Sequence, residues 1–441
     1  MKRLLPLLLC AVLALFCATT AQAAGVSITL TASEYALHYA FDAGAQDPFV
    51  ILEYTTPAEK GWMMLYSEDG HFEGDVSLAY SGAGGKTSVA LTSARTTGSI
   101  GKASTTLPKA ADYQKPTGKS NAKVTDFVLT ETPEGFHYAF NAIGTDYMLL
   151  YWRSKEQTVT QPVYPDENGH YEGDVISDLT FARTQFTVQV KSGSGSMKKE
   201  ATVRKGYQAP EAPQRQEGRL SGVTVCIDAG HQENGRFVNE PIGPGLSGST
   251  SGKGGMAQGT KTNRRESIVC LEIGMLLRDE LLRQGANVIM TREDQTTFHT
   301  NIERCEIAEA GGAQIMLRLH CNNSSNRSKR GIQVYGPLNS DYAKAVADAD
   351  TYREMGQKLL DAMKTRVGMT LANSTGMVRL NDNYVGNNWA KMMCFLVEMG
   401  YLSNPAEEYL LVTPVYQQWL AEGMADGVYE IAVARGWVQA Q

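Results

Sequence analysis

The chain has 441 residues and carries 41 Lys and Arg against 47 Asp and Glu, a formal net charge of −6. At about 150 residues per domain, this length predicts about three domains rather than one. Hydrophobic residues make up 42% and charged residues 20%, a balance that allows folded cores and excludes global disorder. The acidic balance argues against a nucleic-acid partner, because proteins that bind nucleic acid usually present a basic surface.

The N-terminus has the pattern of a secretory signal peptide. Lys2 and Arg3 precede an apolar run at 4–18, and Ala-Gln-Ala at 21–23 supplies the small residues of a cleavage site. A membrane anchor is the alternative, but the run holds about 15 residues, whereas a spanning helix needs roughly 20. We therefore predict a signal peptide at 1–23, secretion, and no transmembrane segment in the mature chain.

Two blocks in the N-terminal half recur at a constant offset of 99 residues. His-Tyr-Ala-Phe at 38–41 returns at 137–140, and Gly-His-Phe-Glu-Gly-Asp-Val at 70–76 returns with Tyr in place of Phe at 169–175. Short runs of β-branched and aromatic residues separated by turns surround both copies. The repeat predicts two tandem small all-β domains, each resembling a β-sandwich.

The blocks and the composition between them set the boundaries of these domains. We place the first β domain at 24–100 and the second at 122–205. The Ser-, Thr-, Lys- and Gly-rich stretch at 101–121 and the Pro-containing stretch at 206–219 are predicted linkers. The repeated histidines are expected to serve the fold rather than a metal; they are His38, His71, His137 and His170.

From residue 220 onward, patterns of buried strands alternate with patterns of helices. The predicted strands cover 223–227, 286–290, 314–319 and 393–397. The predicted helices cover 267–283, 302–310 and 342–367. This alternation predicts an α/β catalytic domain at 220–437 with a mostly parallel sheet.

Cysteines lie only in this C-terminal domain once the signal is excluded: Cys226, Cys270, Cys305, Cys321 and Cys394. Their odd number and irregular spacing match neither a disulfide framework nor a Cys-x-x-Cys zinc site. Most of them flank apolar runs, so we expect buried free thiols.

Three candidate metal ligands fall where this topology would gather them. His231 follows the first strand and His320 follows the third, at carboxyl ends of strands, where ligands bind in open α/β sheets. Glu266 stands in the first turn of the helix that begins near Arg264. Two histidines and a carboxylate with an open fourth position are the ligand set of a catalytic zinc.

Spacing alone leaves other roles open for these residues. A histidine at a strand end is more often a hydrogen-bonding rim residue than a ligand. Glu266 could close a capping box with Asn263. Glu240 competes with Glu266 as the carboxylate ligand, and Asp228 could orient His231.

Five short segments in the C-terminal half stand in a characteristic order. They are Ile227-Asp228-Ala229-Gly230-His231, Arg264-Arg265-Glu266, Thr291-Arg292 followed by Arg304, Leu319-His320-Cys321-Asn322, and Val397-Glu398-Met399-Gly400-Tyr401-Leu402-Ser403-Asn404-Pro405. Together they make residues 220–437 resemble the zinc-dependent N-acetylmuramoyl-L-alanine amidases of the amidase 3 type. The N-terminal repeats carry no such resemblance.

The resemblance implies Zn²⁺ bound by His231, Glu266 and His320, with Glu398 as the catalytic carboxylate. It implies a secreted peptidoglycan hydrolase of the bacterial envelope, extracellular or cell-wall associated. Zinc-activated water would cleave the amide between the lactyl group of N-acetylmuramic acid and L-alanine of the stem peptide. Alternatives are a zinc peptidase acting within the stem peptide and an inactive wall-binding protein.

One departure from the family concerns the loop between the first two ligands. The simplest members place the carboxylate soon after the first histidine, whereas residues 232–265 intervene here. A long loop without its own periodicity is often functional. We expect this loop to rim the cleft and to limit access to the peptide stem.

Overall fold

The computed structural model describes residues 19–440, apart from 23–25, 34–35, 46, 58–59, 79–82, 96–97, 111–122, 133–134, 144–147, 154–157, 164, 177–183, 193–197, 206–208, 234–237, 251–254 and 369–376. The chain divides into two compact units, residues 1–115 and 116–441. The first predicted β domain lies in the first unit, and the second β domain and the α/β domain lie in the other.

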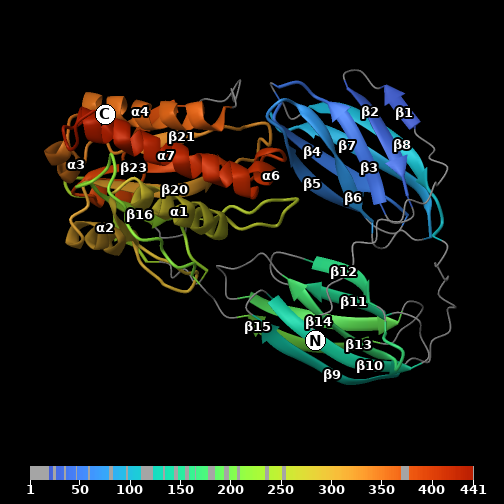
Figure 1. The fold of residues 1–441 in the computed structure, drawn as a ribbon. Helices are drawn as coiled ribbons and strands as arrows, with labels where there is room; N and C mark the ends of the chain where they lie inside the picture. The colour runs from blue at the N-terminus through green and yellow to red at the C-terminus, as the bar shows by residue number, and fades with distance from the viewer. Residues whose placement is uncertain are drawn as a thin grey trace. The chain divides into compact units, whose positions relative to one another are not determined.

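The first β domain consists of two antiparallel sheets (Figure 1). One sheet has the order β1 (Thr19–Gln22), β2 (Ser27–Ala32), β3 (Ala36–Asp42), β6 (His71–Ser77). The other has the order β5 (Lys60–Tyr66), β4 (Phe49–Thr55), β7 (Gly85–Ser93), β8 (Ser99–Leu107). Alternate side chains of both sheets share one buried core, which includes Ile28, Leu30, Leu37, Val50, Leu52, Val89 and Leu91. This shared core is that of a β-sandwich.

Strand β8 corrects the linker that the sequence predicted from residue 101. Its Ser, Thr and Lys content suggested a flexible segment, yet residues 99–107 pair with β7. Buried Ala103, Thr105 and Leu107 alternate with exposed neighbours, the period of a strand with one face on a core. Residues 111–121 of the predicted linker lie outside the described residues.

Strand β1 falls within the predicted signal peptide. Thr19–Gln22 pairs antiparallel with β2, from Thr19 opposite Leu30 to Gln22 opposite Ser27. Cleavage after residue 23 would therefore remove one edge strand and leave β2 as the edge of its sheet. The apolar run at 4–18 lies outside the described residues.

The second β domain repeats this arrangement with one strand fewer among its described residues. Its sheets have the orders β13 (His170–Ile176), β10 (Gly135–Ile143), β9 (Lys123–Thr132) and β12 (Thr158–Val163), β11 (Met148–Arg153), β14 (Thr184–Ser192), β15 (Lys198–Lys205). Side chains of both sheets again share one core, including Phe136, Phe140, Leu150, Trp152, Tyr171, Phe186 and Val188.

The repeated residues explain why both copies keep the same sheet. A Cβ atom at Gly74 would lie 2.7 Å from the Tyr39 hydroxyl, and one at Gly173 would lie 2.7 Å from that of Tyr138. Each tyrosine thus packs across a glycine of the neighbouring strand. Tyr39 and Tyr138 are both 6% exposed, so they are core residues.

The repeated histidines bridge the same pair of strands on the solvent-facing side. His38 Nδ1 lies 3.1 Å from Asp75, and its Nε2 lies 3.3 Å from Glu73. His137 and Asp174 repeat the first of these pairs at 2.9 Å. These contacts join β3 to β6 and β10 to β13, which agrees with a role in the fold.

The C-terminal domain has a mixed six-stranded sheet. The order is β19 (Asn287–Met290), β16 (Thr224–Ala229), β20 (Ile315–Asn322), β23 (Met393–Tyr401), β21 (Gln333–Gly336), β22 (Met377–Leu380). Neighbouring strands run parallel except for β21 against β23. The predicted strands are present, and the sheet is mostly parallel, as expected. Strands β21 and β22 were not predicted.

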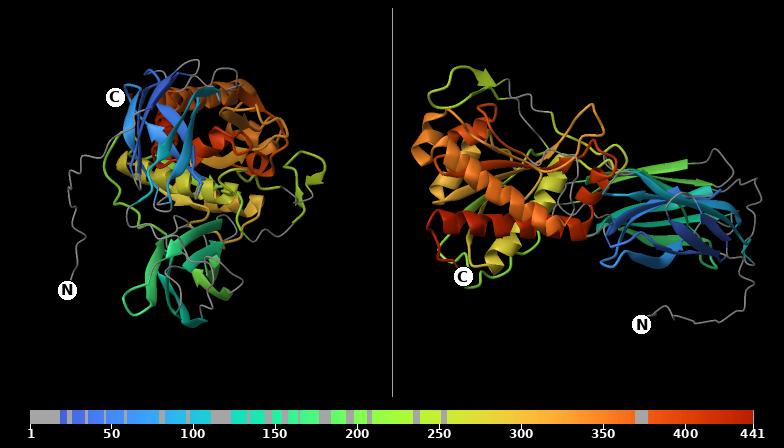
Figure 2. Two further views of the ribbon diagram at one scale, coloured as in Figure 1. Left: turned by 90° about the vertical axis from the view of Figure 1, so that its right-hand side faces the viewer. Right: turned by 90° about the horizontal axis from the view of Figure 1, so that it is seen from above.

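Helices pack on both faces of this sheet (Figures 1 and 2). The helices are α1 (Glu266–Arg283), α2 (Asn301–Ala310), α3 (Asp341–Val346), α4 (Ala349–Val367), α5 (Val385–Trp389), α6 (Glu407–Leu411) and α7 (Pro414–Ala434). Ile227 contacts α1 through Gly274, whereas its neighbour Cys226 shares a cluster with Cys305 of α2. Adjacent strand residues point to opposite faces, so α1 and α2 cover opposite sides.

Two further expectations concern the helices and the thiols. The helix predicted at 342–367 is divided into α3 and α4, because Asp348 caps α4 by accepting a hydrogen bond from the Thr351 amide. All five cysteines of this domain are free and buried, as expected. Among the described residues, no helix has the length and apolar character needed to cross a membrane.

Candidate active site

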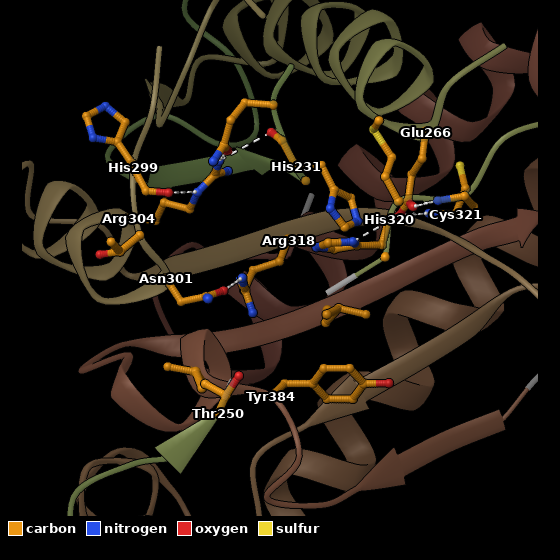
Figure 3. Close-up of a pocket in the computed structure, with 18 of the residues that line it drawn as sticks. His231, Thr250, Glu266, His299, Asn301, Arg304, Arg318, His320, Cys321 and Tyr384 are labelled. Carbon is orange, nitrogen blue, oxygen red and sulfur yellow. Dashed lines mark hydrogen bonds and ion pairs between the residues drawn. The ribbon is translucent and has the colours of Figure 1, made fainter. Parts of the chain in front are cut away.

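Four side chains from four separate elements meet at one edge of the C-terminal sheet. His231 follows β16, His320 lies near the end of β20, and Glu266 is the first residue of α1. Glu398 of β23 stands opposite His320 in the parallel register. All four line one cavity of about 630 Å³. The topology therefore brings the four predicted site residues to one cavity, and Figure 3 shows His231, Glu266 and His320 there.

Two of the predicted ligands, His231 and His320, face the same carboxylate oxygen of the third, Glu266. Glu266 Oε1 lies 3.1 Å from His231 Nε2 and 3.1 Å from His320 Nδ1. The two imidazole rings are 4.9 Å apart between centroids and nearly perpendicular, at 78°. One candidate ligand atom from each residue lies within 4.8 Å of the others. Among the described residues, this is the group of His, Cys, Asp and Glu that could hold a metal ion.

The donor set and its spacing fit a zinc-class ion. Nitrogen and oxygen ligands about 2.0–2.1 Å from a tetrahedral zinc lie roughly 3.3 Å from one another. The separations on Glu266 are close to this value. His320 Nδ1, the ring nitrogen that faces Glu266 Oε1, is therefore the candidate ligand atom of this histidine.

The protonation states also suit metal binding. Burial by itself would raise the pKa of Glu266, but hydrogen bonds with His231 and His320 hold it well below its usual range. Burial lowers the pKa of His320 and outweighs the opposing effect of Glu266. A charged carboxylate beside a neutral imidazole is the form in which these side chains bind metals.

Both alternative roles for the carboxylates are wrong. The residue that caps α1 is Arg265, without a side-chain capping bond, so Glu266 and Asn263 form no capping box. The Glu240 carboxylate instead accepts hydrogen bonds from the backbone amides of Asn301 and Ile302, at 3.2 and 2.8 Å. Glu240 therefore binds the N-terminus of α2 rather than a metal.

The backbone at His231 is folded tightly against β20. His231 has a φ of 57°, in the left-handed region that few non-glycine residues adopt. The Gly230 amide donates to the Leu319 carbonyl at 2.9 Å. A Cβ atom at Gly230 would lie 2.4 Å from that carbonyl oxygen and 2.6 Å from the His320 ring. Glycine at 230 thus permits the close approach of the two histidines.

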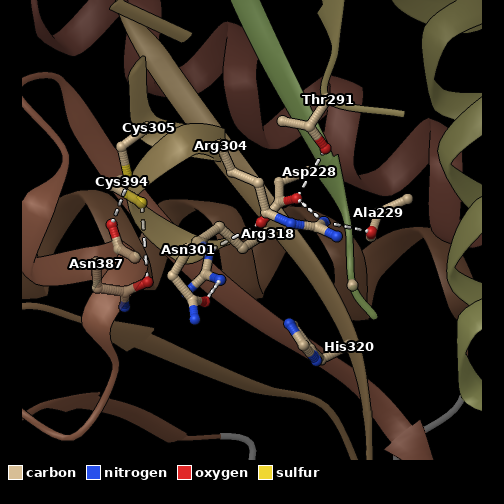
Figure 4. Close-up of polar contacts among 12 residues, drawn as sticks. Asp228, Ala229, Thr291, Asn301, Arg304, Cys305, Arg318, His320, Asn387 and Cys394 are labelled. Carbon is tan, nitrogen blue, oxygen red and sulfur yellow. Dashed lines mark hydrogen bonds and ion pairs between the residues drawn. The ribbon is translucent and has the colours of Figure 1, made fainter. Parts of the chain in front are cut away.

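Asp228 holds two arginines beneath the cavity (Figure 4). Its fully buried carboxylate accepts hydrogen bonds from Thr291 at 2.8 Å, from Arg318 Nε at 2.9 Å and from Arg304. None of the hydrogen bonds described for Asp228 ends on the His231 ring, so Asp228 does not contact that ring directly. Arg304 makes the connection instead, by donating to the His231 carbonyl at 3.3 Å.

Glu398 lies in an environment that favours its protonated form. Burial, aided by the negative charge of Glu266, raises the pKa of Glu398 to about 8. Its Oε2 atom is buried and has no hydrogen-bond partner among the described residues. A carboxyl group with a pKa near neutrality can both accept and release protons at physiological pH.

This raised pKa predicts a pH-dependent stability in the metal-free protein. Because the folded pKa exceeds the unfolded value, wild-type protein should lose stability relative to Glu398→Gln as the pH rises from about 4.5 to 8. The difference should reach the order of 2–4 kcal/mol and level off above pH 9. Urea unfolding of chelator-treated proteins at several pH values measures it. If the free energies of unfolding of the two proteins changed in parallel with pH, this result would contradict the raised pKa of Glu398.

The long loop at 232–265 lines the cavity, as expected. Its contributing residues include Val238, Glu240, Thr250, Met256 and Ala257. The first half of the loop is tied to the domain by side chains of α5. Asn388 donates to the Ile242 carbonyl at 3.1 Å, and Trp389 donates to the Pro241 carbonyl at 2.9 Å.

Several residues that line the cavity were not predicted as part of the site. His299 lines the cavity together with Asn301. Arg318 stands two residues before His320 on β20 and therefore on the same face of the sheet. Tyr384 comes from the segment before α5, far from the recognised motifs, and lines the cavity as well. The period-two position of Arg318 could have signalled its place, whereas Tyr384 had no such signal.

Comparisons with known proteins match the C-terminal half of the chain to one family. Residues 225–430 match the family described as N-acetylmuramoyl-L-alanine amidase, amidase 3. A germination-specific N-acetylmuramoyl-L-alanine amidase of Bacillus subtilis is 26% identical over 231 residues, which span 49% of this chain and 83% of that protein. A probable cell wall amidase LytH of Staphylococcus aureus is 27% identical over 218 residues, 48% of this chain and 60% of that protein.

Solved structures with related sequences include two further amidases. The N-acetylmuramoyl-L-alanine amidase of Clostridium difficile 630 aligns with 48% of this chain and 96% of its own, at 23% identity and a TM-score of 0.38. Ami1 of Mycobacterium smegmatis aligns with 49% of this chain and 99% of its own, at 17% identity and a TM-score of 0.43. The family match lies wholly within the C-terminal domain and includes the four site residues. Residues 225–430 thus match the N-acetylmuramoyl-L-alanine amidase family.

Proposed function

We propose that the protein is a zinc-dependent peptidoglycan hydrolase that cleaves the amide between the lactyl group of N-acetylmuramic acid and L-alanine. The convergence of His231 and His320 on one oxygen of Glu266, each at 3.1 Å, carries this proposal. It supplies the ligands of a catalytic zinc inside the cavity that Glu398 also lines. The family match supports the amide as the bond that is cleaved.

The roles of the chain's own residues follow from their environments. An amide carbonyl is a weak electrophile, and a bound zinc supplies polarisation of that carbonyl and acidification of water. Glu398 takes a proton from the attacking water and later transfers it to the leaving amine nitrogen, so that acid and amine are released. Its neutral-range pKa suits both transfers. In this proposal the residues that line the cavity position the substrate, so that the distance of each proton transfer is short.

Two experiments separate this function from its alternatives. Mass spectrometry of digested peptidoglycan should show glycan with a free lactyl group and intact stem peptides that begin with L-alanine. Fragments cut within the stem peptide would instead identify a zinc peptidase. A zinc-loaded protein that binds cell wall without releasing either product would identify an inactive wall-binding protein.

The loop at 232–265 should act on access to the cavity rather than on the metal. Deleting Gly245–Gly255 removes β18 (Ser249–Thr250), the strand that pairs with Glu240 and Pro241, and keeps Glu240 in the chain. We expect the rate on intact cell wall to change more than the zinc content, because the ligands lie outside the deleted stretch. Turbidity clearing of cell wall and metal analysis provide the two readouts. An unchanged rate on intact wall would refute this role.

The N-terminal part would deliver the catalytic domain to its substrate. In this proposal the signal at 1–23 directs secretion to the bacterial envelope, and the two β domains act as spacer or wall-targeting modules. The net charge of −6 means that any hold on an anionic wall requires specific sugar or peptide contacts.

A further inference from the structure

Arg292 is a buried arginine whose guanidinium donates hydrogen bonds to backbone carbonyl groups rather than to a carboxylate. It follows β19, whose parallel pairing with β16 brings it to the turn that carries His231. Its side chain is buried, at 2% exposure. Each hydrogen bond described for its guanidinium ends on a backbone carbonyl: Ala229 at 2.8 Å, Gly230 at 2.8 Å, Ser267 at 2.7 Å and Asp294 at 2.9 Å.

Two of these carbonyls belong to the immediate neighbours of two candidate ligands. Arg292 Nη2 donates both to Gly230, the residue before His231, and to Ser267, the residue after Glu266. One nitrogen thus joins the β16 turn to the first turn of α1. Gln295, also fully buried, donates to the same Ser267 carbonyl at 2.8 Å.

Burial of the Arg292 guanidinium costs free energy. Burying a guanidinium without a hydrogen-bonded carboxylate forfeits the charge compensation that buried arginines usually have. The same carbonyl bonds hold a turn in which His231 has a φ of 57°. A planar guanidinium has donors at fixed angles, so it can hold several carbonyls in one geometry, which a lysine cannot do.

We propose that Arg292, supported by Gln295, is a positioning residue that sets the separation of His231 and Glu266 and thereby the affinity of the site for a zinc-class divalent cation. This inference rests on the metal site in the proposed function. Arg292 touches no ligand side chain; it acts through the backbone on either side of the cavity. Outer-shell partners of this kind typically change metal affinity by about 10- to 100-fold.

The test measures metal affinity rather than activity alone. Chelator competition on full-length protein should show Zn²⁺ binding weakened by about 10- to 100-fold in Arg292→Lys. The visible absorption of the Co²⁺-substituted variant should shift, because the ligand geometry has changed. Arg278→Lys is the control for loss of a buried guanidinium: Arg278 is 4% exposed on α1, and it donates to Asp279 at 2.8 Å and to the Pro210 carbonyl at 3.3 Å, away from the cavity. Its affinity and spectrum should match wild type.

A second variant decides the matter if Arg292→Lys does not fold. Gln295→Met keeps the volume and removes the donor to Ser267, and Gln295 Oε1 has no hydrogen-bond partner to lose among the described residues. It should weaken Zn²⁺ binding by about 2- to 10-fold, the value of one hydrogen bond. Wild-type affinity and an unchanged Co²⁺ spectrum in the variants that fold would overturn this inference alone. Wild-type protein that binds no zinc would overturn both it and the proposed function.

Discussion

Glu398→Gln is expected to lower kcat on peptidoglycan by about 10²- to 10⁴-fold, the usual contribution of a positioned general acid–base. The zinc content should stay at the wild-type level, because the candidate ligands are His231, Glu266 and His320. Glutamine keeps the size of the side chain but can neither take the proton of the attacking water nor pass it to the amine. Released muropeptides and bound metal are measured on the same preparations.

A surface variant controls for nonspecific damage. Glu309→Gln removes a carboxylate that pairs with Lys391 at 2.8 Å on the exterior, and it should retain full activity. Loss of both zinc and cleavage in Glu398→Gln would make Glu398 a ligand rather than the proton carrier. Full activity in this variant would remove it from the mechanism.

Asp228→Asn is expected to destabilise the catalytic domain by about 3–5 kcal/mol, the typical effect of removing one partner from a buried charge cluster. The substitution preserves shape but leaves Arg304 and Arg318, both 4% exposed, without their shared counter-charge. Burial alone would raise the pKa of Asp228, but the two guanidinium groups hold it far below its usual range. Chemical unfolding of the two proteins measures the difference.

The pH dependence gives this prediction its sign. The folded pKa is depressed, so the stabilisation is complete above the unfolded pKa near 4 and is lost only as the pH falls toward the folded value. The gap between wild type and Asp228→Asn should therefore be constant from pH 8 to 5 and should narrow in stronger acid. Asp350→Asn is the control, because its partner Arg353 is an exposed neighbour on α4. An equal, small effect in both variants would show that Asp228 is not a buried counter-charge.

The candidate ligands could be predicted because their positions follow from local pattern and family motif. A buried strand followed by His231, another ended by His320, and an apolar helix that begins at Glu266 each appear within a few residues of sequence. Parallel pairing of β16 with β20 then requires the two strand ends to share one edge.

Two features could not be predicted from the sequence. For strand β8 the composition suggested a linker, and for Glu240 the hydrogen-bond donors lie 61 and 62 residues away in the chain. Residues 99–107 have the polar content of a linker, but β7 supplies the backbone partner that makes them a strand. In the sequence, Glu240 is a loop carboxylate that competes with Glu266 as the candidate metal ligand. Only the folded structure shows that the N-terminus of α2 lies beside Glu240, whose carboxylate oxygens accept hydrogen bonds from the backbone amides there.

The sequence by itself determined the repeat, the α/β character of the C-terminal half and the four candidate site residues, because each of these follows from periodicity or from contiguous motifs. The tertiary structure decided which carboxylate faces the histidines, what neutralises Asp228 and what holds the His231 turn. Those choices depend on distances between segments far apart in the chain, such as Arg292 and Ser267. Sequence spacing carries no direct record of such distances, since loop length barely constrains where two folded segments meet.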